Sequence, residues 1–179
     1  MIGAGYVGLV SGSCFAEFGA SVTCVDVVQE KIDALKSGVM PIYEPGLDAL
    51  VKKNVDAGRL SFSTDLASEV PKADIIFIAV GTPTRRGDGH ADLKYVYEAA
   101  KQIGQHLNGY TVIVNKSTVP VGTASQVSRL IAEVNPGAEF SVASNPEFLR
   151  EGAAIGDFMR PDRVVLGIED ARAESVLRE

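Results

Sequence analysis

Cysteine and histidine are scarce in this sequence, which has two of each among its 179 residues. Cys14 and Cys24 do not form a CxxC pair and have no histidine clustered with them, so their spacing does not indicate a metal site or a redox centre. Because free cysteines are mostly buried, we expect two inert core thiols. His90 and His106 have no partner signal in the sequence, and we assign neither a role.

The sequence also lacks a basic run and a long apolar run. Lys and Arg total 17 against 23 Asp and Glu, and the net charge of -6 is spread along the chain, so we expect no nucleic-acid partner. A membrane helix needs roughly 20 successive apolar residues, and a secretory signal needs a basic segment followed by an apolar one. Since neither pattern is found, we expect a soluble cytoplasmic protein that does not associate with a membrane.

The sequence does have an alternation of short apolar runs with longer amphipathic stretches. The strand-like runs are residues 21–25, 60–63, 73–80, 111–114, 140–143 and 164–168. The helix-like stretches are residues 8–18, 29–37, 46–57, 93–107 and 123–134. This alternation predicts an α/β fold with a doubly wound parallel sheet covered by helices, the Rossmann arrangement.

Both ends of the sequence are abrupt relative to this pattern. A glycine-rich turn follows a strand, yet only Met1 and Ile2 precede Gly3, so we expect a truncated first strand. Residues 170–179 look like the opening of a helix with no terminating signal. We therefore expect residues 1–179 to be one Rossmann domain of a larger enzyme, and poorly soluble alone because neighbouring strand edges would be exposed.

Residues 3–8 have the G-x-G-x-x-G spacing of a dinucleotide-binding turn. Gly3 would make the tight turn, Gly5 would let a pyrophosphate approach the backbone, and Gly8 would let the helix pack on the strand. The N–H groups and dipole of the helix start would hold the anion. A glycine-rich turn without a ligand is the alternative. The candidate cofactor residues of the turn are Gly3, Ala4, Gly5, Tyr6, Val7 and Gly8.

Asp26 follows the second strand, 18 residues after Gly8, close to the roughly 20-residue offset of a ribose-binding acid. A carboxylate at this position accepts hydrogen bonds from ribose hydroxyls and repels a 2′-phosphate, so NAD is favoured over NADP. An aspartate at a strand end is also a common helix N-cap, which is the alternative for Asp26 alone. Together the turn and Asp26 predict a dinucleotide site.

Four further segments resemble those of a known family. They are Pro-Ile-Tyr-Glu-Pro-Gly-Leu at 41–47, Gly-Thr-Pro-Thr at 81–84, Lys-Ser-Thr-Val-Pro-Val-Gly-Thr at 116–123 and Asn-Pro-Glu-Phe-Leu-Arg-Glu-Gly at 145–152. With the glycine turn, they make the whole sequence similar to the amino-terminal domain of UDP-glucose 6-dehydrogenases. Residues 160–164 also resemble the UDP-glucose branch, while GDP-mannose and UDP-N-acetylmannosamine dehydrogenases share much of the framework and remain alternatives.

The resemblance implies NAD-dependent, four-electron oxidation of UDP-glucose to UDP-glucuronate. In such enzymes a cysteine captures the intermediate aldehyde, and water hydrolyses the resulting thioester. Neither Cys14 nor Cys24 matches that cysteine, so we expect this chain to supply the NAD-binding half of the site and to be inactive alone. The full-length enzyme is expected to be a homo-oligomer. A single-step hydroxyacid dehydrogenase and a non-catalytic NAD-binding module are the other hypotheses.

For the cofactor, the resemblance implies contacts of Asp26 and Lys31 with the adenosine ribose. The remaining implied cofactor residues are Val80, Gly81, Thr82, Pro83, Thr84, Ser117, Thr118, Val119 and Glu151. The hydroxyls of Thr82, Ser117 and Thr118 suit a pyrophosphate, a ribose or a bound water. For Thr82 the alternative is a turn residue that caps the next helix, and we expect Thr123 to cap the helix that follows it.

Asn145 and Pro146 are typical of a helix N-cap and first turn, which would place Glu147 and Glu151 on one helix face. The resemblance assigns both glutamates to substrate binding and acid–base work, with Glu151 activating the water and Thr118 holding it. The implied substrate residues are Glu147, Phe148, Leu149, Arg150 and Glu151. The alternatives are a first-turn acid for Glu147 and a solvated surface residue for Glu151. Arg85 and Arg86 are either a phosphate clamp or solvated loop charges.

Overall fold

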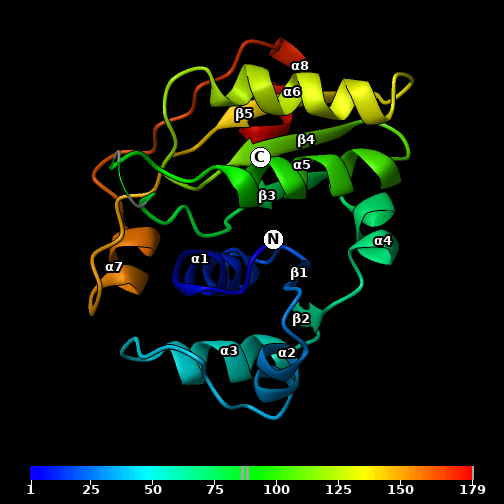
Figure 1. The fold of residues 1–179 in the computed structure, drawn as a ribbon. Coiled ribbons are helices and arrows are strands. Elements are labelled where there is room, and N and C mark those ends of the chain that lie inside the picture. Colours follow the sequence, from blue (N-terminus) through cyan, green and yellow to red (C-terminus); the bar gives the residue numbers. More distant parts are fainter. Residues whose placement is uncertain (86, 88, 179) are drawn as a thin grey trace. The chain divides into compact units, whose positions relative to one another are not determined.

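The structure is a computed structural model that describes residues 1–85, 87 and 89–178 (Figure 1). Every strand pair within its named strands is parallel, and helices separate the strands along the chain, so the predicted parallel α/β fold is confirmed. The chain divides into two compact units. Unit 1 comprises Met1–Asp65 and Glu147–Val164, and unit 2 comprises the described parts of 66–146 and 165–178.

Unit 1 is built around a two-stranded parallel pair. Its elements are α1 (Tyr6–Glu17), β1 (Val22–Val25), α2 (Gln29–Lys36), α3 (Leu47–Asp56), β2 (Leu60–Ser63) and α7 (Ala154–Met159). Val22 of β1 lies opposite Leu60 of β2, and Ile2 forms a parallel bridge with Val25. The bridge places the glycine turn directly before α1, next to the carboxyl end of β1.

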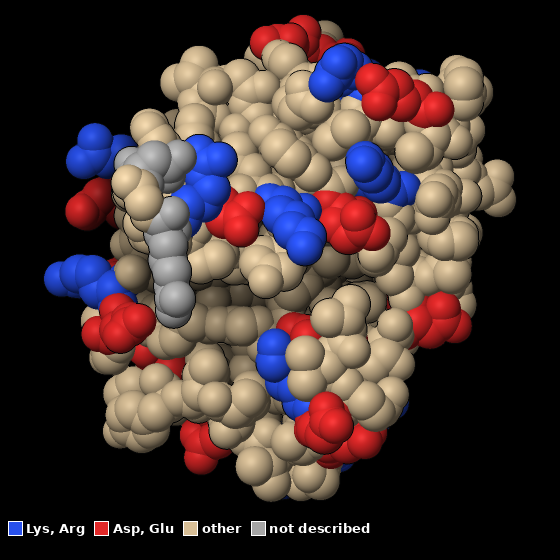
Figure 2. Space-filling model, in the orientation of Figure 1, with Lys and Arg blue, Asp and Glu red and all other residues tan. Residues whose placement is uncertain are grey.

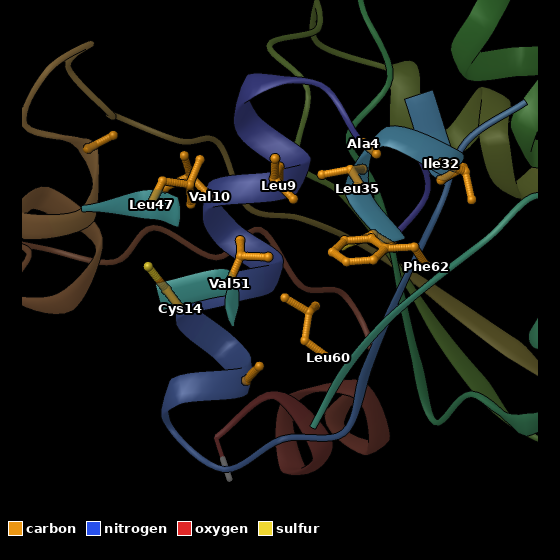
Figure 3. Packing of buried hydrophobic residues seen from close by; sticks show 13 residues of the cluster. Ala4, Leu9, Val10, Cys14, Ile32, Leu35, Leu47, Val51, Leu60 and Phe62 are labelled. Carbon is orange, nitrogen blue, oxygen red and sulfur yellow. The ribbon is translucent and has the colours of Figure 1, made fainter. Parts of the chain in front are cut away.

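The core of unit 1 forms around α1, which is apolar on most of its surface. A helix that is hydrophobic all round must be buried, and Leu9, Val10 and Cys14 of α1 are fully buried. They cluster with Leu47 of α3 and Phe62 of β2, among others (Figure 3). Helix α1 is therefore held from several sides, which fixes the position of its N-terminus.

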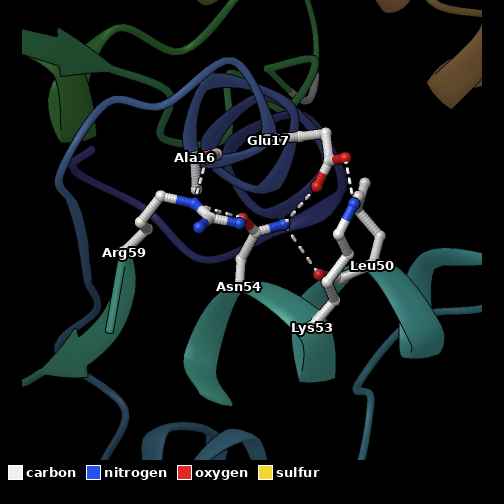
Figure 4. A network of polar contacts seen from close by, with 6 residues as sticks. All are labelled: Ala16, Glu17, Leu50, Lys53, Asn54 and Arg59. Atoms are coloured by element: carbon white, nitrogen blue, oxygen red, sulfur yellow. Dashed lines mark hydrogen bonds and ion pairs between the residues drawn. The ribbon is translucent and has the colours of Figure 1, made fainter. Parts of the chain in front are cut away.

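A polar network secures the other end of α1 (Figure 4). Asn54, fully buried on α3, donates to Glu17 Oε2 at 3.0 Å and accepts from Arg59 Nη2 at 2.8 Å. Arg59 Nε also donates to the carbonyl of Ala16 at 2.9 Å, and Lys53 is paired with Glu17. The carbonyl of Ala16 also accepts from the N–H of Gly19 at 3.1 Å, so the Arg59 contact is its second bond, and it ties α1 to α3 and β2.

Unit 2 contains a three-stranded parallel sheet in the order β3-β4-β5. Its elements are α4 (Leu66–Glu69), the 3₁₀ helix η1 (Val70–Lys72), β3 (Ile75–Ile78), α5 (Lys94–His106), β4 (Thr111–Asn115), α6 (Thr123–Val134), β5 (Phe140–Ser144) and α8 (Ala171–Leu177). Ile75 of β3 lies opposite Val112 of β4, and Thr111 lies opposite Phe140 of β5. The carboxyl ends of the three strands therefore lie at one edge of this sheet.

Helices cover the sheet of unit 2 and pack closely on one another. Val112 and Val114 of β4 cluster with Ala173 of α8. Helices α5 and α6 lie side by side (Figure 1), and a Cβ added at Gly104 of α5 would lie only 2.7 Å from Val134 Cγ2 of α6. The absence of a side chain at Gly104 is what allows this close approach.

Most predicted helices and strands are confirmed, with boundaries that differ by a few residues. The strand predicted at residues 164–168 is wrong. Gly167 exchanges backbone hydrogen bonds of 2.8 and 2.9 Å with Ser144, as an isolated antiparallel bridge beside the end of β5. Val164 and Val165 remain 66% and 40% exposed. An apolar run predicts a strand only where a neighbour pairs along its length, and here the pairing stops at one bridge.

Charged side chains of both signs are interspersed on the face shown in Figure 2. Several of them pair along a helix, such as Lys52 with Asp56 and Arg178 with Glu174, each at 2.7 Å. Within the described part of the chain, no helix is long and apolar enough to cross a membrane.

Candidate cofactor site

The glycine turn has the geometry of an anion-binding helix start. Gly3 has a φ of 100°, which L side chains rarely adopt, and its N–H donates to the carbonyl of Val25 at 2.7 Å. Gly5 is the N-cap of α1 and has an ordinary extended conformation, with φ of -82°. A Cβ built on Gly5 would meet nothing within 4 Å. The fold therefore requires glycine at position 3 but not at position 5, where it leaves open space before the helix.

The open space at Gly5 leaves the start of α1 accessible to an anion. The first N–H groups of an α-helix lack intrahelical acceptors, and together with the helix dipole they attract an anion. The first turn of α1 carries no acidic residue that would repel one. The turn thus meets the steric and electrostatic requirements of a dinucleotide.

Asp26 is bonded to this turn. Its Oδ2 accepts from the backbone N–H of Ala4 at 2.9 Å and from Lys31 Nζ at 2.6 Å, while its Oδ1 accepts from the N–H of Val28 at 3.1 Å. Burial opposes ionisation of Asp26, but these hydrogen bonds outweigh it and hold its pKa below the usual range. The N-cap of α2 is Val28, so the interpretation of Asp26 as that cap is wrong.

Asp26 retains acceptor capacity for a ribose. A carboxylate offers about four acceptor positions, and the bonds from Ala4, Lys31 and Val28 use part of this capacity. Oδ1 accepts one of these bonds and Oδ2 accepts two, so Oδ1 has more acceptor capacity left. The structure therefore brings Ala4, Asp26 and Lys31 together, as expected for the ribose end of the site.

The two predicted cofactor loops of unit 2 contact each other. Ser117 Oγ donates to the carbonyl of Val80 at 2.7 Å, and Thr82 Oγ1 donates to the carbonyl of Thr118 at 3.4 Å. These bonds join residues 80–84, after β3, to residues 117–119, after β4. The hydroxyl of Thr82 acts between loops, and the N-cap of α5 is Leu93, so the capping alternative for Thr82 is wrong.

The capping role expected of Thr123 is also wrong. Thr123 is the first residue of α6, and Gly122, with a φ of 88°, is its N-cap. Thr123 Oγ1 donates to the carbonyl of Pro120 at 2.7 Å. The hydroxyl thus closes the turn before the helix, whereas an N-cap side chain would accept from a helical N–H.

The helix predicted to begin at Asn145 is wrong, and Glu147 and Glu151 do not share a helix face. Residues 145–150 are irregular, and α7 begins only at Ala154. The side-chain amide of Asn145 accepts from Lys116 Nζ at 3.0 Å and donates to the carbonyl of Val165 at 2.9 Å. Its hydrogen bonds are therefore made to these residues and not to the N–H groups of a following helix. Gly152, with a φ of 86°, further interrupts any helix between Asn145 and Ala154.

The segment at 147–151 has its own internal contacts. Glu147 Oε2 accepts from the N–H of Leu149 at 2.6 Å, and Leu149 packs against the core of unit 1. Arg150 forms an ion pair with Asp157 at 2.7 Å, and the Arg150 guanidinium and N–H lower the pKa of Asp157 to about 2. Phe148 and Glu151 are exposed. Of the predicted catalytic residues, Glu147 and Glu151 belong to unit 1 and Thr118 belongs to unit 2.

The predicted arginine clamp receives no support. The N–H of Arg85 donates to the carbonyl of His90 at 2.7 Å, which closes the loop between them. Arg86 lies outside the described residues. The clamp therefore stays a prediction.

Glu44 was not singled out by the sequence, yet its side chain is bonded to Tyr6 of the glycine turn. It is 5% exposed, accepts from the hydroxyl of Tyr6, and accepts from the N–H groups of Gly152 and Ala154 at 2.7 and 2.9 Å. The one available signal was a charged residue enclosed by prolines and glycine in residues 41–47. Its partners more than 100 residues away leave no periodic trace in the sequence.

Parallel strands, a glycine turn that opens before a helix, and an acid at the end of the next strand define a Rossmann NAD-binding domain. Residues 1–179 match the model of the UDP-glucose/GDP-mannose dehydrogenase family, NAD binding domain. The chain belongs to this family, whose cofactor is NAD.

Relatives and solved structures agree with this assignment. UDP-glucose 6-dehydrogenase of Rhizobium meliloti (strain 1021) is 63% identical over 181 residues, covering 100% of this chain and 41% of that protein. UDP-glucose 6-dehydrogenase TuaD of Bacillus subtilis (strain 168) is 56% identical over 180 residues, covering 100% of this chain and 39% of that protein. This chain therefore spans about two fifths of the length of these relatives.

Among solved structures, a UDP-glucose dehydrogenase from the hyperthermophilic archaeon Pyrobaculum islandicum matches with a TM-score of 0.94 and 46% identity, over 98% of this chain and 41% of that one. A ternary complex of GDP-mannose dehydrogenase from Pseudomonas aeruginosa matches with a TM-score of 0.93 and 38% identity, over 99% of this chain and 42% of that one. The fold is thus shared by both branches of the family.

Proposed function

We propose that this chain supplies the NAD-binding part of an enzyme that oxidises UDP-glucose to UDP-glucuronate. The observation that carries the cofactor part is the open space at Gly5, beside the Asp26 carboxylate that is bonded to the same turn. The relatives at 63% and 56% identity are named for UDP-glucose, which favours this substrate over GDP-mannose.

For the cofactor, the first turn of α1 would hold the pyrophosphate, and Asp26 with Lys31 would hold the adenosine ribose. Residues 80–84 and 117–119 would line the rest of the cofactor site. When bound, NAD accepts a hydride in each of the two oxidation steps. The carboxylate of Asp26 would disfavour a 2′-phosphate by charge repulsion.

For the chemistry, we assign water activation in the hydrolysis step to Glu151 and the holding of that water to Thr118. Glu147 and its neighbours up to Arg150 would contact the substrate. A glutamate with its carboxylate exposed to solvent, as Glu151 has, can take a proton from an attacking water. A homo-oligomeric full-length enzyme and a cytoplasmic location belong to the same proposal and rest on the sequence resemblance.

Cofactor binding is tested with Gly5→Ala. The substitution should lower the free energy of unfolding by only about 1 kcal/mol, because alanine is a poorer N-cap than glycine but the added Cβ meets nothing within 4 Å. It should lower NAD affinity about tenfold or more, since the methyl group displaces charge-assisted hydrogen bonds at the helix start. Gly137→Ala, also in open space, is the matched control. Calorimetric titration that gave equal NAD affinities for Gly5→Ala and the wild type would contradict the proposed site.

The substrate is tested in the full-length enzyme. Oxidation of an alcohol to a carboxylate releases two hydrides, so we expect two NADH per UDP-glucuronate formed. UDP-glucose should be turned over at least about tenfold faster than GDP-mannose at equal concentration, a difference of about 1.4 kcal/mol in activation free energy. One NADH per product, or a preference for GDP-mannose, would overturn the assignment.

A further inference from the structure

Glu44 is a buried carboxylate that joins two segments with proposed functional roles. Its Oε2 accepts from the hydroxyl of Tyr6, in the glycine turn, and from the N–H of Gly152 at 2.7 Å. Its Oε1 accepts from the N–H of Ala154 at 2.9 Å. Because all of these residues belong to unit 1, the connection lies within one compact body.

The donors and the acceptor in this cluster are fixed. Burial would raise the pKa of Glu44, but the hydrogen bonds from Tyr6, Gly152 and Ala154 outweigh it and lower that pKa below its usual range. Burial and the bond to Glu44 raise the pKa of Tyr6 to about 12. At neutral pH the phenol therefore donates and the carboxylate accepts. A buried charge of this kind is stable only with such partners.

The cluster contacts the backbone on both sides of the proposed site. The N–H of Gly152 belongs to the planar peptide unit that begins at Glu151, so the carboxylate of Glu44 restrains the main chain of Glu151 directly. Tyr6 is the first residue of α1, where the N–H groups face the proposed pyrophosphate position. A single side chain thus restrains the cofactor turn and the segment of the proposed base.

We propose that Glu44 is a positioning residue, which holds the NAD turn and the Glu151 segment in a fixed relation through the hydroxyl of Tyr6. This proposal rests on the proposed function for the roles of the turn and of Glu151. Residues 41–47 take no part in the proposed contacts with NAD or with the substrate, and the positioning role of Glu44 gives this segment a function.

Two variants distinguish loss of the link between Tyr6, Glu44 and Gly152 from loss of the folded structure. Tyr6→Phe removes only the hydroxyl, and leaves Glu44 bonded to Gly152 and Ala154. Glu44→Gln removes the charge and replaces one of the two acceptor oxygens by an NH2 group, which cannot accept from these donors. Tyr43→Phe is the matched control, because Tyr43 is 86% exposed on the same segment.

The first measurement is amide hydrogen exchange of the chain without NAD. Glu44→Gln should speed the exchange of the Gly152 and Ala154 amides about tenfold, the size expected for lost bonds to a charged group. The amide of Leu50 on α3 should change less than about twofold in the same sample, as local rather than global opening requires. Equal acceleration at all three amides, or none at Gly152 and Ala154, would overturn the proposal whether or not NAD binds.

The second measurement adds NAD at saturation. In the wild type and Tyr43→Phe, NAD should slow the exchange of the Gly152 and Ala154 amides about fivefold or more, the range of an ordinary coupling between sites. In Tyr6→Phe this response should disappear, and NAD affinity should fall by no more than the same factor of about five, because coupling between two sites is reciprocal. An undiminished response in Tyr6→Phe would overturn the proposal. Failure of the wild type to bind NAD would instead refute the proposed function. The first measurement would still show whether Glu44 restrains the Gly152 and Ala154 amides.

The kinetic measurement uses the full-length enzyme. Tyr6→Phe should lower kcat about tenfold or more with KM for NAD nearly unchanged, because small displacements of a reacting group cost rate rather than binding. A purely structural role predicts loss of folded enzyme at constant kcat per active site. An unchanged kcat in Tyr6→Phe would contradict the positioning role.

Discussion

The backbone N–H of Ala4 donates to Oδ2 of Asp26 at 2.9 Å across 22 residues of sequence. The residue proposed to recognise the ribose is therefore bonded to the turn proposed to hold the pyrophosphate. Lys31 donates to the same oxygen at 2.6 Å. The carboxylate of Asp26 therefore contributes to the shape of the turn and to the position of Lys31, and in the proposed function it also sets the choice between NAD and NADP.

Asp26→Asn should weaken NAD binding about tenfold, the cost of replacing a charged acceptor by a neutral one. It should also narrow the preference for NAD over NADP, because the repulsion of a 2′-phosphate is lost and Lys31 is left without its partner. Asp33→Asn, an exposed position on α2, is the matched control. The measurement is calorimetric titration with both nucleotides. An unchanged ratio of the two affinities would show that Asp26 does not set the preference.

The Arg150–Asp157 pair should contribute stability that disappears in acid. The hydrogen bonds from Arg150 lower the pKa of Asp157 from 3.8 to about 2. A lowered pKa in the folded state stabilises the protein above the unfolded pKa, and this contribution is lost as the pH falls through the folded value. The pH-dependent part of the difference in unfolding free energy between wild type and Asp157→Asn should thus be constant from pH 5 to 7, a range above both pKa values. It should fall as the pH drops from about 4 to about 2 and be lost below about pH 2.

This pH dependence is checked by urea unfolding across the pH range. In an Arg150→Gln background, the pH-dependent effect of Asp157→Asn should become smaller, because the guanidinium is gone while the backbone N–H of residue 150 still donates to Asp157. Arg150 is 78% exposed, so the pair is screened by solvent and 1 M salt should reduce the effect. A pH-dependent difference as large in Arg150→Gln as in the wild-type background would rule out the guanidinium as its source.

The sequence pattern predicted the elements that local periodicity determines. The apolar run at β4 is buried at every position, and the amphipathic stretch at α6 has the predicted bounds. The G-x-G-x-x-G turn and Asp26 also lie where their spacing predicts, since both are set by short-range steric needs at a strand end. These features depend on neighbours within a few residues, or on the known sequence distance between the glycine turn and the ribose-binding acid.

Features that depend on distant partners were not predictable. Asn145 looks like a helix cap, but its amide is bonded to Lys116 and to the carbonyl of Val165, so the helix does not form. The sequence gives Glu44 no distinguishing signal, but the side chain bonds to residues 108 and 110 positions away. Capping signals and charge are local properties, whereas these contacts follow from how the chain folds back on itself.

Cys14 and Cys24 should be unreactive in the folded protein. Both are free and buried, which confirms the expectation of core thiols. Burial, with a smaller effect of the Glu17 charge, raises the pKa of Cys14 to about 12, and burial raises that of Cys24 to about 11. Because the thiolate is the reactive form, we expect no reaction with a thiol-specific disulfide reagent at pH 8 within minutes. Two thiols per chain should react after unfolding in guanidinium, and rapid labelling of the native chain would contradict the buried positions.

Close packing of α1 on β1 depends on the absence of a side chain at Gly12. A Cβ at this position would lie 2.7 Å from Cys24 Sγ and 3.5 Å from Val22 Cγ1. Gly12→Ala should therefore lower the free energy of unfolding by about 1–3 kcal/mol through overpacking. This loss should appear despite the roughly 1 kcal/mol that alanine gains over glycine inside a helix.

A double-mutant cycle in urea isolates the contact responsible for that loss. In a Cys24→Ala background, Gly12→Ala should become neutral or stabilising, because the nearest remaining neighbour is Val22 at an ordinary contact distance. Gly156→Ala on α7, where an added Cβ meets nothing within 4 Å, is the control and should stabilise by up to about 1 kcal/mol. Equal destabilisation by Gly12→Ala in both backgrounds would show that the crowding lies elsewhere than at Cys24.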